Sequence, residues 1–538
     1  MIHIKHTKHT VLITTSGIGE RLGNITKYTN KSLVKVGDKY AICYIIETYK
    51  PDTEFIITLG YYGNYVKDFL LLAYPTRNFI FVEIDNYVGE GSSLGYSLLK
   101  SKEYLQKPFI FHCCDSIVID EMQIDPDKNT LYVYPSETSD NYANIKVANT
   151  HTTTSTTTCN NIVKELNLKK HKDYDYVYTG ISHIKDYDIF WKYLEDIYRT
   201  NPKNTSLSDV HSIQSMITQG IEFNYNVLNN WYDTGNVKSY DKIKNDIKPK
   251  YIVIEKFYES LCFLDNRVIK FINDTEINKK RVIRGNALYP LTPKILGYTD
   301  NFFIMDLIEG ELVCDVYEDD IIYNLLSWSK ENVWNEHIKN TEYIDCCKRF
   351  YIDKTLDRLS KLDFLKEEKN IINGLPCQPI VEYIKQIPVE LFTTDVFTRF
   401  HGDFILDNII KTKDTFRLID WRHEFDNQLH YGDIYYDLAK LRHNLIFNHS
   451  NISNNLFTVQ YDPVDNNSVI VDLKCNYFLI KQLEDFEKFV HENKYDLNKI
   501  KMLTSIIWLN MSPLYEGKLS EFLFYFGKYN LFSLKDVV

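Results

Sequence analysis

The first 245 residues alternate short apolar runs, typical of buried strands, with stretches whose apolar residues recur at helical spacing. Residues 11–13, the run that ends at Asp115, and residues 174–184 are expected to be core strands, and residues 209–217 a helix. Strands that alternate with helices usually form a parallel sheet covered by helices on both faces. We therefore predict an α/β domain over residues 1–245, built on a doubly wound, mostly parallel, Rossmann-like sheet.

The pattern changes after residue 250. Residues 267–271 alternate as a strand does, and FFIMDLIEGEL at 302–312 is typical of a strand that runs into a connection. Beyond residue 313 the apolar residues recur mainly at helical spacing, which is more often core than an interaction surface. We predict a second domain over residues 250–538, divided into a small lobe at 250–312 and a mainly helical large lobe at 313–538.

Two polar stretches interrupt these patterns. The lysine-rich stretch at 240–251 is the best candidate for a linker between the two domains. HTTTSTTTC at 151–159 is of low complexity and is expected to form the tip of a hairpin. Neither stretch is assigned any chemistry.

Length, charge and composition limit the classes of partner that we expect for this chain. A chain of 538 residues exceeds one typical core, and its net charge of −11, with lysines mixed among acids, argues against nucleic acid as the main partner. No apolar run reaches eighteen residues, so we expect no membrane partner and a cytoplasmic location. The ten cysteines show no CxxC or zinc spacing and are expected to be buried, reduced thiols.

A polar cluster near residue 400 has the composition of a phosphoryl-transfer site. HGDFILDNII, residues 401–410, places Asp403 and Asn408 five residues apart, the spacing of the catalytic aspartate and metal-binding asparagine in protein kinases. Residues 411–415 predict a hairpin turn, and the strand after it would end at Asp420, with that carboxylate facing Asn408. The set supplies a carboxylate that orients a hydroxyl and oxygen ligands for Mg²⁺.

The plainer interpretation is that His401 and Asp403 cap a helix and Asp420 ends an ordinary strand. The order of the motifs favours the functional one. With HGD in place of HRD and IDW in place of DFG, residues 250–538 resemble the aminoglycoside phosphotransferase and choline kinase-like family. The resemblance implies an α+β, bilobal, protein-kinase-like fold, with ATP and Mg²⁺ as cosubstrate and cofactor and a small hydroxyl compound as acceptor.

The same resemblance assigns supporting roles. GDIYYDLAKL at 432–441 resembles the GDxxYDLA segment of the family, in which Asp433 would brace the catalytic loop. Lys270 would pair with the ATP phosphates. By the family pattern its partner carboxylate would be Glu276, but no long helix pattern of the usual kind follows Lys270, and Arg281 or Arg284 could instead contact the phosphates, so the partner is left open. Three residues beside the metal carboxylate could touch the acceptor or be structural: Trp421, Arg422 and Glu424.

A second chemistry is indicated near the N-terminus. The strand at 11–13 enters a loop with Gly17 and Gly19, and such loops place backbone N–H groups around a phosphate. Arg21 follows two residues after the second glycine, and Lys31 ten residues later. A loose GxG alone is common in turns, so Arg21 and Lys31 provide most of the evidence for a phosphate-binding loop.

This stretch resembles the sugar-phosphate nucleotidyltransferase family, which includes phosphocholine cytidylyltransferases and whose loop is AAGxGxRL followed by PK. Here TSG replaces AAG, and Asn30 replaces the proline. The resemblance implies that Arg21 neutralises the β- and γ-phosphates of an NTP, whereas Lys31 holds the α-phosphate and the incoming phosphate. Two later carboxylates, Asp115 and Asp233, the latter in WYDTGN, would bind Mg²⁺.

The segment GEGSSLGYSLL at 89–99 resembles the glycine and small-residue loop of the same family, which opens a helix against the nucleobase. Gly91 and Ser92 would let the nucleobase meet backbone groups, while Ser92 or Ser93 could equally cap the following helix. These two roles are compatible.

Together these motifs predict a bifunctional enzyme. One half would phosphorylate a small alcohol with ATP, and the other would couple the phosphate to a second NTP, CTP first and UTP next, for surface glycan or capsule precursors. Two alternatives stay open: a sugar-1-phosphate nucleotidyltransferase fused to an independent kinase, or one half acting only as a binding or scaffold module. The expected partners are small phosphates, alcohols and nucleotides, and homo-oligomerisation is left open.

Overall fold

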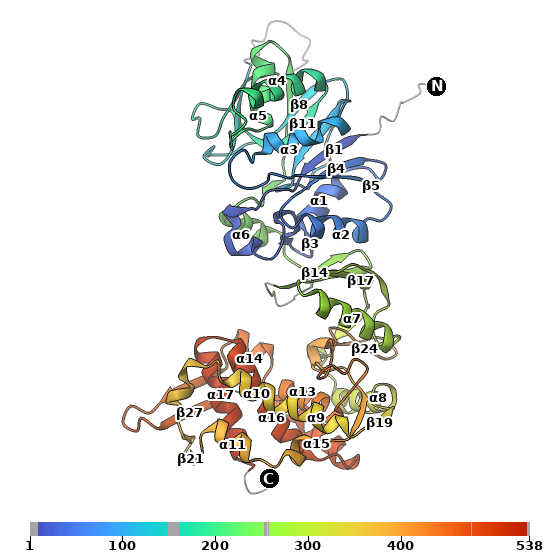
Figure 1. Ribbon diagram of the computed structural model, residues 1–538, viewed down its shortest axis with the longest axis vertical. Coiled ribbons are helices and arrows are strands. Elements are labelled where there is room, and N and C mark those ends of the chain that lie inside the picture. The colour runs from blue at the N-terminus through green and yellow to red at the C-terminus, as the bar shows by residue number, and fades with distance from the viewer. Residues whose placement is uncertain (1–8, 149–160, 252–255, 257, 475, 535–538) are drawn as a thin grey trace. The chain divides into compact units, whose positions relative to one another are not determined.

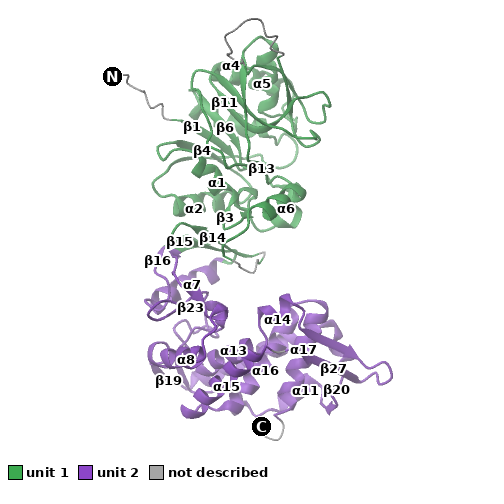
Figure 2. Ribbon diagram, turned by 180° about the vertical axis from the view of Figure 1, so that it is seen from behind, with its two compact units in different colours: residues 1–274, 297–304 green, residues 275–296, 305–538 purple. Residues whose placement is uncertain are grey.

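The structure is a computed structural model that describes residues 9–148, 161–251, 256, 258–474 and 476–534. The chain forms two compact units (Figure 2). Unit 1 comprises residues 1–274 and 297–304, and unit 2 comprises residues 275–296 and 305–538. The division between the units therefore passes through the segment 250–312.

Unit 1 is built on a nine-stranded sheet, with its main path in the order β10-β9-β11-β6-β1-β4-β5. Strands β1, β4 and β5 of this sheet lie side by side in Figure 1. Strands β6, β1, β4 and β5 are parallel, which confirms the α/β prediction for this half of the sheet. Strand β11 runs antiparallel to β6, β8 and β9, so the sheet is mixed beyond β6. The strands span Thr10–Thr14 (β1), Glu54–Leu59 (β4), Asn78–Glu83 (β5), Phe109–Cys113 (β6), Asn129–Tyr134 (β8), Asn144–Val147 (β9), Val163–Asn167 (β10), Tyr176–Ile184 (β11) and Phe223–Val227 (β12).

Helices cover both faces of this sheet, because successive residues of a strand point to opposite sides. Val11 and Ile13 join one apolar core with helices α1 (Ala41–Thr48) and α2 (Gly63–Ala73). Leu12 joins the other core with three further helices: α3 (Leu94–Ser101), α4 (Tyr187–Thr200) and α5 (Asp209–Thr218). The strand expected at 11–13, the one expected before Asp115 and the helix expected at 209–217 are all confirmed.

A small four-stranded sheet, β14-β15-β17-β16, follows the large one in sequence. Its residues Cys262, Ile269 and Phe271 belong to the same apolar core as α1 and α2, so this part of the sheet is integral to unit 1. The Tyr40 hydroxyl lies 2.5 Å from the Ser260 hydroxyl. The strands span Glu259–Leu264 (β14), Arg267–Ile272 (β15), Ile295–Tyr298 (β16) and Phe302–Asp306 (β17).

Unit 2 is mainly helical, as the sequence predicts beyond residue 313. Helices α13, α15, α16 and α17 all contribute buried residues to one large apolar core. The helices used below span Thr275–Leu288 (α7), Ile321–Asn332 (α8), Lys354–Leu359 (α10), Ile434–Ile446 (α13), Tyr477–Glu492 (α15), Leu497–Met511 (α16) and Gly517–Phe532 (α17). The short strands near the polar cluster span Val396–Arg399 (β22), Ile409–Lys411 (β23) and Phe416–Leu418 (β24).

The structure corrects two sequence-based expectations. The stretch expected to be a linker begins inside a helix, α6 (Val237–Asp246), whose Tyr240 and Ile243 are buried. The sequence also gave no indication of a long helix after Lys270, yet α7 is present there. Its buried face includes Asn278, Arg284 and Gly285, so apolar periodicity could not reveal it.

Three other expectations concern local features. The strands that flank the low-complexity stretch, β9 and β10, pair antiparallel. Residues 151–159, the expected tip of this hairpin, lie outside the described residues. The eight cysteines within the described ranges form no disulfide. Within those ranges, no helix has both the length and the apolar character needed to cross a membrane.

Candidate functional site

The N-terminal loop of unit 1 is folded tightly over Lys31. Gly19 has a φ of +70°, a left-handed conformation that glycine adopts without steric cost. A Cβ at this position would lie 3.1 Å from both the Lys31 Cβ and the Thr26 Cγ2. Gly17 has no atom within 4 Å of an equivalent Cβ, so its space is open. Gly19 is therefore the glycine that the loop conformation requires.

Asn30, the departure from the family pattern, holds this loop in place. Its buried amide donates to the Thr15 carbonyl at 2.8 Å and to the Tyr61 carbonyl at 2.6 Å. Its Oδ1 accepts from the backbone and the hydroxyl of Ser32. Because Asn30 satisfies four polar groups at once, it can fix the position of Lys31 where a proline could only restrict the backbone.

Lys31 and Asp115 form an ion pair at the end of β6. The Lys31 Nζ lies 3.3 Å from the Asp115 Oδ2, and the Cys113 thiol donates to the Asp115 Oδ1 at 2.7 Å. Burial alone would raise the pKa of Asp115, but the charge of Lys31, the Cys113 hydrogen bond and the charge of Arg21 lower it to about 2. Asp115 is therefore ionised at neutral pH.

Asp233 is brought beside Asp115 by strand pairing. Strand β13 (Trp231–Asp233) pairs with β7 (Ser116–Val118), so that Asp233 lies opposite Ser116. A Cβ on Gly235 would be 2.6 Å from the Asp115 Oδ2, 2.9 Å from the Asp233 Oδ1 and 3.1 Å from the Arg21 Nη2. Both carboxylates and the guanidinium therefore converge on one point. The four residues predicted from sequence, Arg21, Lys31, Asp115 and Asp233, are brought together.

The two carboxylates are electrostatically unequal. Burial and the neighbouring charge of Asp115 raise the pKa of Asp233 above its ordinary value. Three donors oppose this rise: the Gly235 N–H at 2.7 Å, the Tyr142 hydroxyl at 2.9 Å and the Asn236 amide at 2.9 Å. A cation placed between the two carboxylates would relieve their mutual repulsion.

Sequence reasoning missed three residues around this point. Tyr142 and Asn236 hold Asp233, and Lys169 lies within electrostatic reach of Arg21, Asp115 and Asp233. Burial and the charge of Arg21 lower the pKa of Lys169, whereas the two carboxylates oppose that change. Lys169 follows β10, far along the chain from the other basic residues. Only the pairing of β10 with β9 brings it near them, and no spacing rule predicts that pairing.

We expect Gly235→Ala to disable this site without unfolding unit 1. The added methyl group would enter the gap between Asp115, Asp233 and Arg21 and displace them. A misplacement of about 1 Å at a reacting centre can lower a rate by roughly 100-fold. Nucleotide-dependent pyrophosphate release should fall by about that factor, while the thermal unfolding midpoint changes little. Unchanged release with the methyl group accommodated would show that Gly235 does not border the reacting groups.

The loop at 89–99 has the conformation expected of a helix entry. Ser93 caps α3, because its side chain accepts a hydrogen bond from the Tyr96 N–H at 3.0 Å, and this settles which serine is the cap. Ser92 donates instead to the Gly89 carbonyl at 2.7 Å. Gly91 has a φ of +79°. The nucleobase contacts expected of Gly91 and Ser92 stay a prediction.

In unit 2 the HGD loop follows β22 and is braced by Asp437, not by Asp433. The Asp437 carboxylate accepts from the His401 N–H at 2.8 Å, the Gly402 N–H at 2.7 Å and the Trp334 indole at 3.0 Å. Asp433 caps α13 and accepts from the Tyr351 hydroxyl. The expectation that Asp433 braces the loop is therefore wrong. The bracing carboxylate lies one helical turn later, where its side chain faces the loop.

Asp403 is held by Asn408 and Lys440. The Asn408 amide donates to the Asp403 carbonyl at 3.0 Å and to its Oδ2 at 3.1 Å, which confirms the proximity expected from their spacing. The Lys440 Nζ lies 2.8 Å from the Asp403 Oδ1. Burial would raise the pKa of Asp403, but the charge and hydrogen bond of Lys440 lower it below its ordinary value. Sequence reasoning missed Lys440, although it lies within the GDIYYDLAKL segment.

We expect Lys440→Met to weaken any phosphoryl transfer at Asp403 in a pH-dependent way. Lys440 lowers the pKa of Asp403, so its removal should raise that pKa and move the acidic limb of kcat/KM to higher pH. A pKa rise of about one to two units would move the acidic limb up by about the same number of pH units, so the loss should be largest near pH 5 and small at pH 8.5. A pH-rate profile of ADP formation measures this. An equal loss at both pH values would assign Lys440 a structural role only.

The hairpin that carries Asp420 is confirmed. Strands β23 and β24 pair antiparallel, with Ile409 opposite Leu418, and the Ile419 N–H donates to the Asn408 carbonyl at 2.9 Å. Asp420 has a φ of +52° and forms an ion pair with Arg281 of α7. The negative charge of Asp420 acts to raise the pKa of Asp403, so these two carboxylates are near one another. The structure therefore places Asp403, Asn408 and Asp420 in one polar cluster.

Arg284 and Lys270, two further charged residues singled out in the sequence, belong to different units. Arg284 is buried, and its guanidinium donates to the carbonyls of Phe400, His401 and Arg422. Arg284 therefore supports the HGD loop from behind. Lys270 belongs to unit 1, where it is buried and lies 3.3 Å from Glu259 of the adjacent strand. The phosphate-pairing role of Lys270 stays a prediction.

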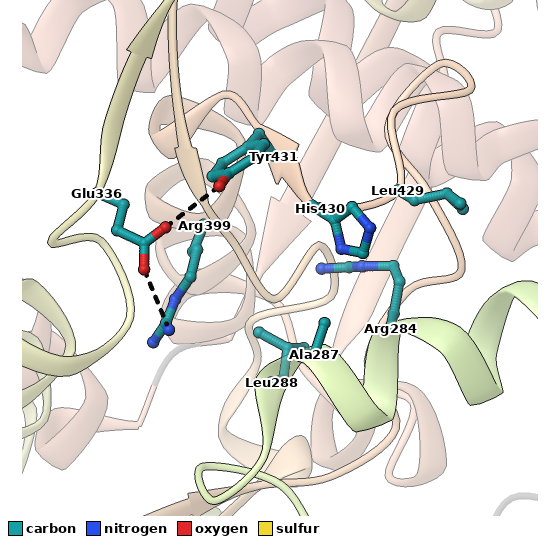
Figure 3. A pocket seen from close by; sticks show the side chains of 8 residues that line it. All are labelled: Arg284, Ala287, Leu288, Glu336, Arg399, Leu429, His430 and Tyr431. Atoms are coloured by element: carbon teal, nitrogen blue, oxygen red, sulfur yellow. Dashed lines mark hydrogen bonds and ion pairs between the residues drawn. The ribbon is translucent and has the colours of Figure 1, made fainter.

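A small pocket of about 150 Å³ opens beside Arg284 (Figure 3). Arg284 and His430 both face it, and Glu336 is paired there with Arg399 at 3.5 Å and with the Tyr431 hydroxyl at 3.3 Å. Neither Asp403, Asn408 nor Asp420 lines it. This pocket is therefore separate from the polar cluster on the HGD loop.

The N-terminal region is similar in structure to several solved nucleotidyltransferases. CTP:phosphocholine cytidylyltransferase from Streptococcus pneumoniae is 20% identical, with 45% of this chain and 100% of that chain aligned and a TM-score of 0.37. A UDP-glucose pyrophosphorylase in complex with UDP-glucose is 18% identical over 44% and 98%, with a TM-score of 0.37. The inositol-1-phosphate CTP transferase of T. maritima is 16% identical over 46% and 98%, with a TM-score of 0.35. No family model and no curated protein matches the chain.

Proposed function

We propose that the chain is a bifunctional enzyme that activates a small hydroxyl compound in two steps. Unit 2 phosphorylates the compound with ATP, and unit 1 transfers a nucleotidyl group from a second NTP to the new phosphate, releasing pyrophosphate. The observation that carries the proposal is the convergence of Asp115, Asp233 and Arg21 around Gly235, with Lys31 paired to Asp115. The product of the first reaction belongs to the substrate class of the second.

In unit 1 a phosphate oxygen of the acceptor attacks the α-phosphorus in line, and pyrophosphate leaves. Arg21 neutralises the β- and γ-phosphates, and Lys31 holds the α-phosphate against the incoming phosphate. Lys169, which interacts electrostatically with Arg21, Asp115 and Asp233, adds a third positive charge to this site. Fixed charges of this kind stabilise the transition state because they need no reorganisation during the reaction.

The donor set of unit 1 fits Mg²⁺. This ion is usually held by one or two carboxylates together with substrate phosphates, and Asp115 and Asp233 both border the space beside Gly235. Within the described ranges, no group of three or more His, Cys, Asp or Glu side chains is placed to hold a metal without a substrate. Bound magnesium would supply positive charge between the nucleotide phosphates and the two carboxylates.

In unit 2 Asp403 orients the acceptor hydroxyl and takes its proton, since Lys440 keeps the carboxylate ionised. Asn408 and Asp420 would hold Mg²⁺ against the ATP phosphates. Arg281 pairs with Asp420 in this structure and would have to share that carboxylate with the ion. His401 positions the loop, because its ring lies between the Asp403 N–H and the Ile419 carbonyl.

The nucleotide and the biological role rest on the resemblance of the sequence motifs. CTP is proposed first and UTP second, for precursors of a surface glycan or capsule. The independent kinase and the scaffold module are the competing proposals. The intact carboxylate sets of both units favour two active sites over a scaffold.

A nucleotide panel tests the function of unit 1. The full chain is incubated with Mg²⁺, each of ATP, CTP, GTP and UTP in turn, and a set of phosphate monoesters, and pyrophosphate release is recorded. Release with one NTP, abolished by EDTA, is the expected result. Hydrolysis without an acceptor, or no release with any combination, would contradict nucleotidyl transfer by this unit.

A further inference from the structure

Three carboxylates at and beside the HGD loop each have a lysine or arginine partner. Lys440 pairs with Asp403 at 2.8 Å, Lys280 pairs with Glu424 at 2.6 Å, and Arg281 pairs with Asp420. On the neighbouring helix α10, Asp357 pairs with Lys361 at 2.7 Å. These four carboxylates are therefore already matched by lysine or arginine.

Three further cations share the neighbourhood. Lys354 and Arg358 lie four residues apart on α10, a spacing at which like charges repel on a helix. Arg422 packs beside the HGD loop, since a Cβ on Gly402 would be 2.6 Å from the Arg422 Cβ. The described residues provide no ion pair for these three cations at 4 Å or less. Arg422 and Arg358 donate only to carbonyls, those of Glu424 and Asn510.

Two aromatic rings join these cations into one surface. The Lys354 Nζ lies 4.3 Å from the centre of the Phe350 ring, and the Arg422 guanidinium lies 5.0 Å from the same centre. Arg422 also lies 6.0 Å from the centre of the Tyr436 ring. Both rings are less than a tenth exposed. Their faces are occupied by the protein's own cations and cannot form a cage for a quaternary ammonium group.

A group of cations without close ion-pair partners costs stability, because like charges repel one another in the folded state. Its position beside Gly402, next to Asp403, places it where an acceptor hydroxyl must arrive. We propose that the compound phosphorylated at Asp403 carries an anionic group, a carboxylate or a phosphate, which binds between Lys354 and Arg422. The inference rests on the kinase activity proposed for unit 2 and names the class of its acceptor.

The electrostatics of Lys354 agree with this assignment. Burial, followed by the charges of Arg422 and Arg358, lowers the pKa of Lys354 to about 6, while the nearby Glu424 opposes that change and Lys440 adds to it. An anion bound between the cations would raise this pKa, so binding near neutral pH should take up a proton. The site then gains its full positive charge only with the ligand present.

A matched acceptor series tests the charge preference. The full chain is assayed with ATP and Mg²⁺ against glycerol, glycerate, glycerol 3-phosphate and choline, and ADP formation is followed. We expect kcat/KM for glycerate or glycerol 3-phosphate to exceed that for glycerol by about 10- to 100-fold, the range of one charge-assisted hydrogen bond. The better of the two anions identifies carboxylate or phosphate. A preference for choline or glycerol would overturn the proposal.

Two lysine variants, one on α10 and one just beyond its end, sharpen the test. Lys354→Met should lower the ratio of kcat/KM between the anionic acceptor and glycerol by about 10-fold or more. Lys361→Met is the matched control, because Lys361, two residues beyond the end of α10, is exposed and pairs with Asp357 of that helix. An unchanged ratio in Lys354→Met, with the unfolding midpoint preserved, would overturn the role of Lys354.

A binding measurement separates this inference from the kinase activity itself. Sulfate, which does not titrate near neutral pH, is added to the full chain in calorimetry with buffers of different ionisation enthalpy. We expect binding with proton uptake that Lys354→Met abolishes and Lys361→Met retains. This result without phosphorylation of any acceptor would contradict the kinase proposal and leave the anion site standing. Phosphorylation without Lys354-dependent sulfate binding would do the opposite.

Discussion

Asp403→Asn is expected to lower ATP-dependent phosphorylation by about 10²- to 10⁴-fold, the usual contribution of a positioned general base. The asparagine keeps the shape of the side chain but loses the charge that orients and deprotonates the acceptor hydroxyl. It also removes the ion pair with Lys440. ADP formation with an acceptor measures the loss, and pyrophosphate release by unit 1 should stay within about twofold of the unmodified chain because the reacting groups of unit 1 are separate residues.

Asp414→Asn is the matched control for this variant. Asp414 lies in the exposed turn between β23 and β24. Its substitution by asparagine is the same chemical change as Asp403→Asn, made a few residues away. Its activity should equal that of the unmodified chain. If Asp403→Asn kept most of its phosphorylation rate while remaining folded, the assignment of the base would be wrong. If it lost both activities while folded, the two sites would not be independent.

Lys31→Ala is expected to lower pyrophosphate release by about 10²- to 10³-fold, the cost of removing one fixed donor from a developing charge. It should leave phosphorylation unchanged. The substitution also leaves Asp115 without its ion-pair partner, so the pKa of Asp115 should rise from its present value of about 2 toward the ordinary range. The stability that this carboxylate contributes above its unfolded pKa, and loses as the pH falls through 2, should then be lost at a higher pH.

Lys27→Ala serves as the control for Lys31→Ala. Lys27 is exposed in the same segment, and its ammonium lies over the Tyr28 ring, away from any carboxylate pair. Because breaking a buried ion pair can itself destabilise a fold, unfolding midpoints of both variants must accompany the rates. Full activity in a folded Lys31→Ala protein would remove Lys31 from the proposed mechanism.

Sequence alone predicted the parts of each site that depend on local spacing. The β1 loop, the β23–β24 hairpin and the contact between Asp403 and Asn408 all follow from residues close together in the chain. The convergence of Asp115 with Asp233 was expected from the family resemblance, and strand pairing between β7 and β13 produces it.

The residues that sequence reasoning missed act through contacts between distant segments. Asn30 joins the β1 loop to Tyr61, Lys440 reaches Asp403 from the next helix, and Asp437 braces the loop that Asp433 was expected to brace. Helix α7 was missed because it packs through Arg284 and Gly285. Polar burial of this kind leaves no periodic apolar signal in the sequence.

The coupling of the two reactions can be measured in one reaction mixture. The full chain is incubated with Mg²⁺, ATP, CTP and an unphosphorylated acceptor that supports ADP formation, and the products are separated by mass spectrometry. The proposal predicts a nucleotide-linked acceptor that requires both ATP and CTP and disappears in Asp403→Asn, returning when the phosphorylated acceptor is supplied. If the phosphorylated acceptor accumulates and is never nucleotidylated with any NTP, the two-step account is contradicted.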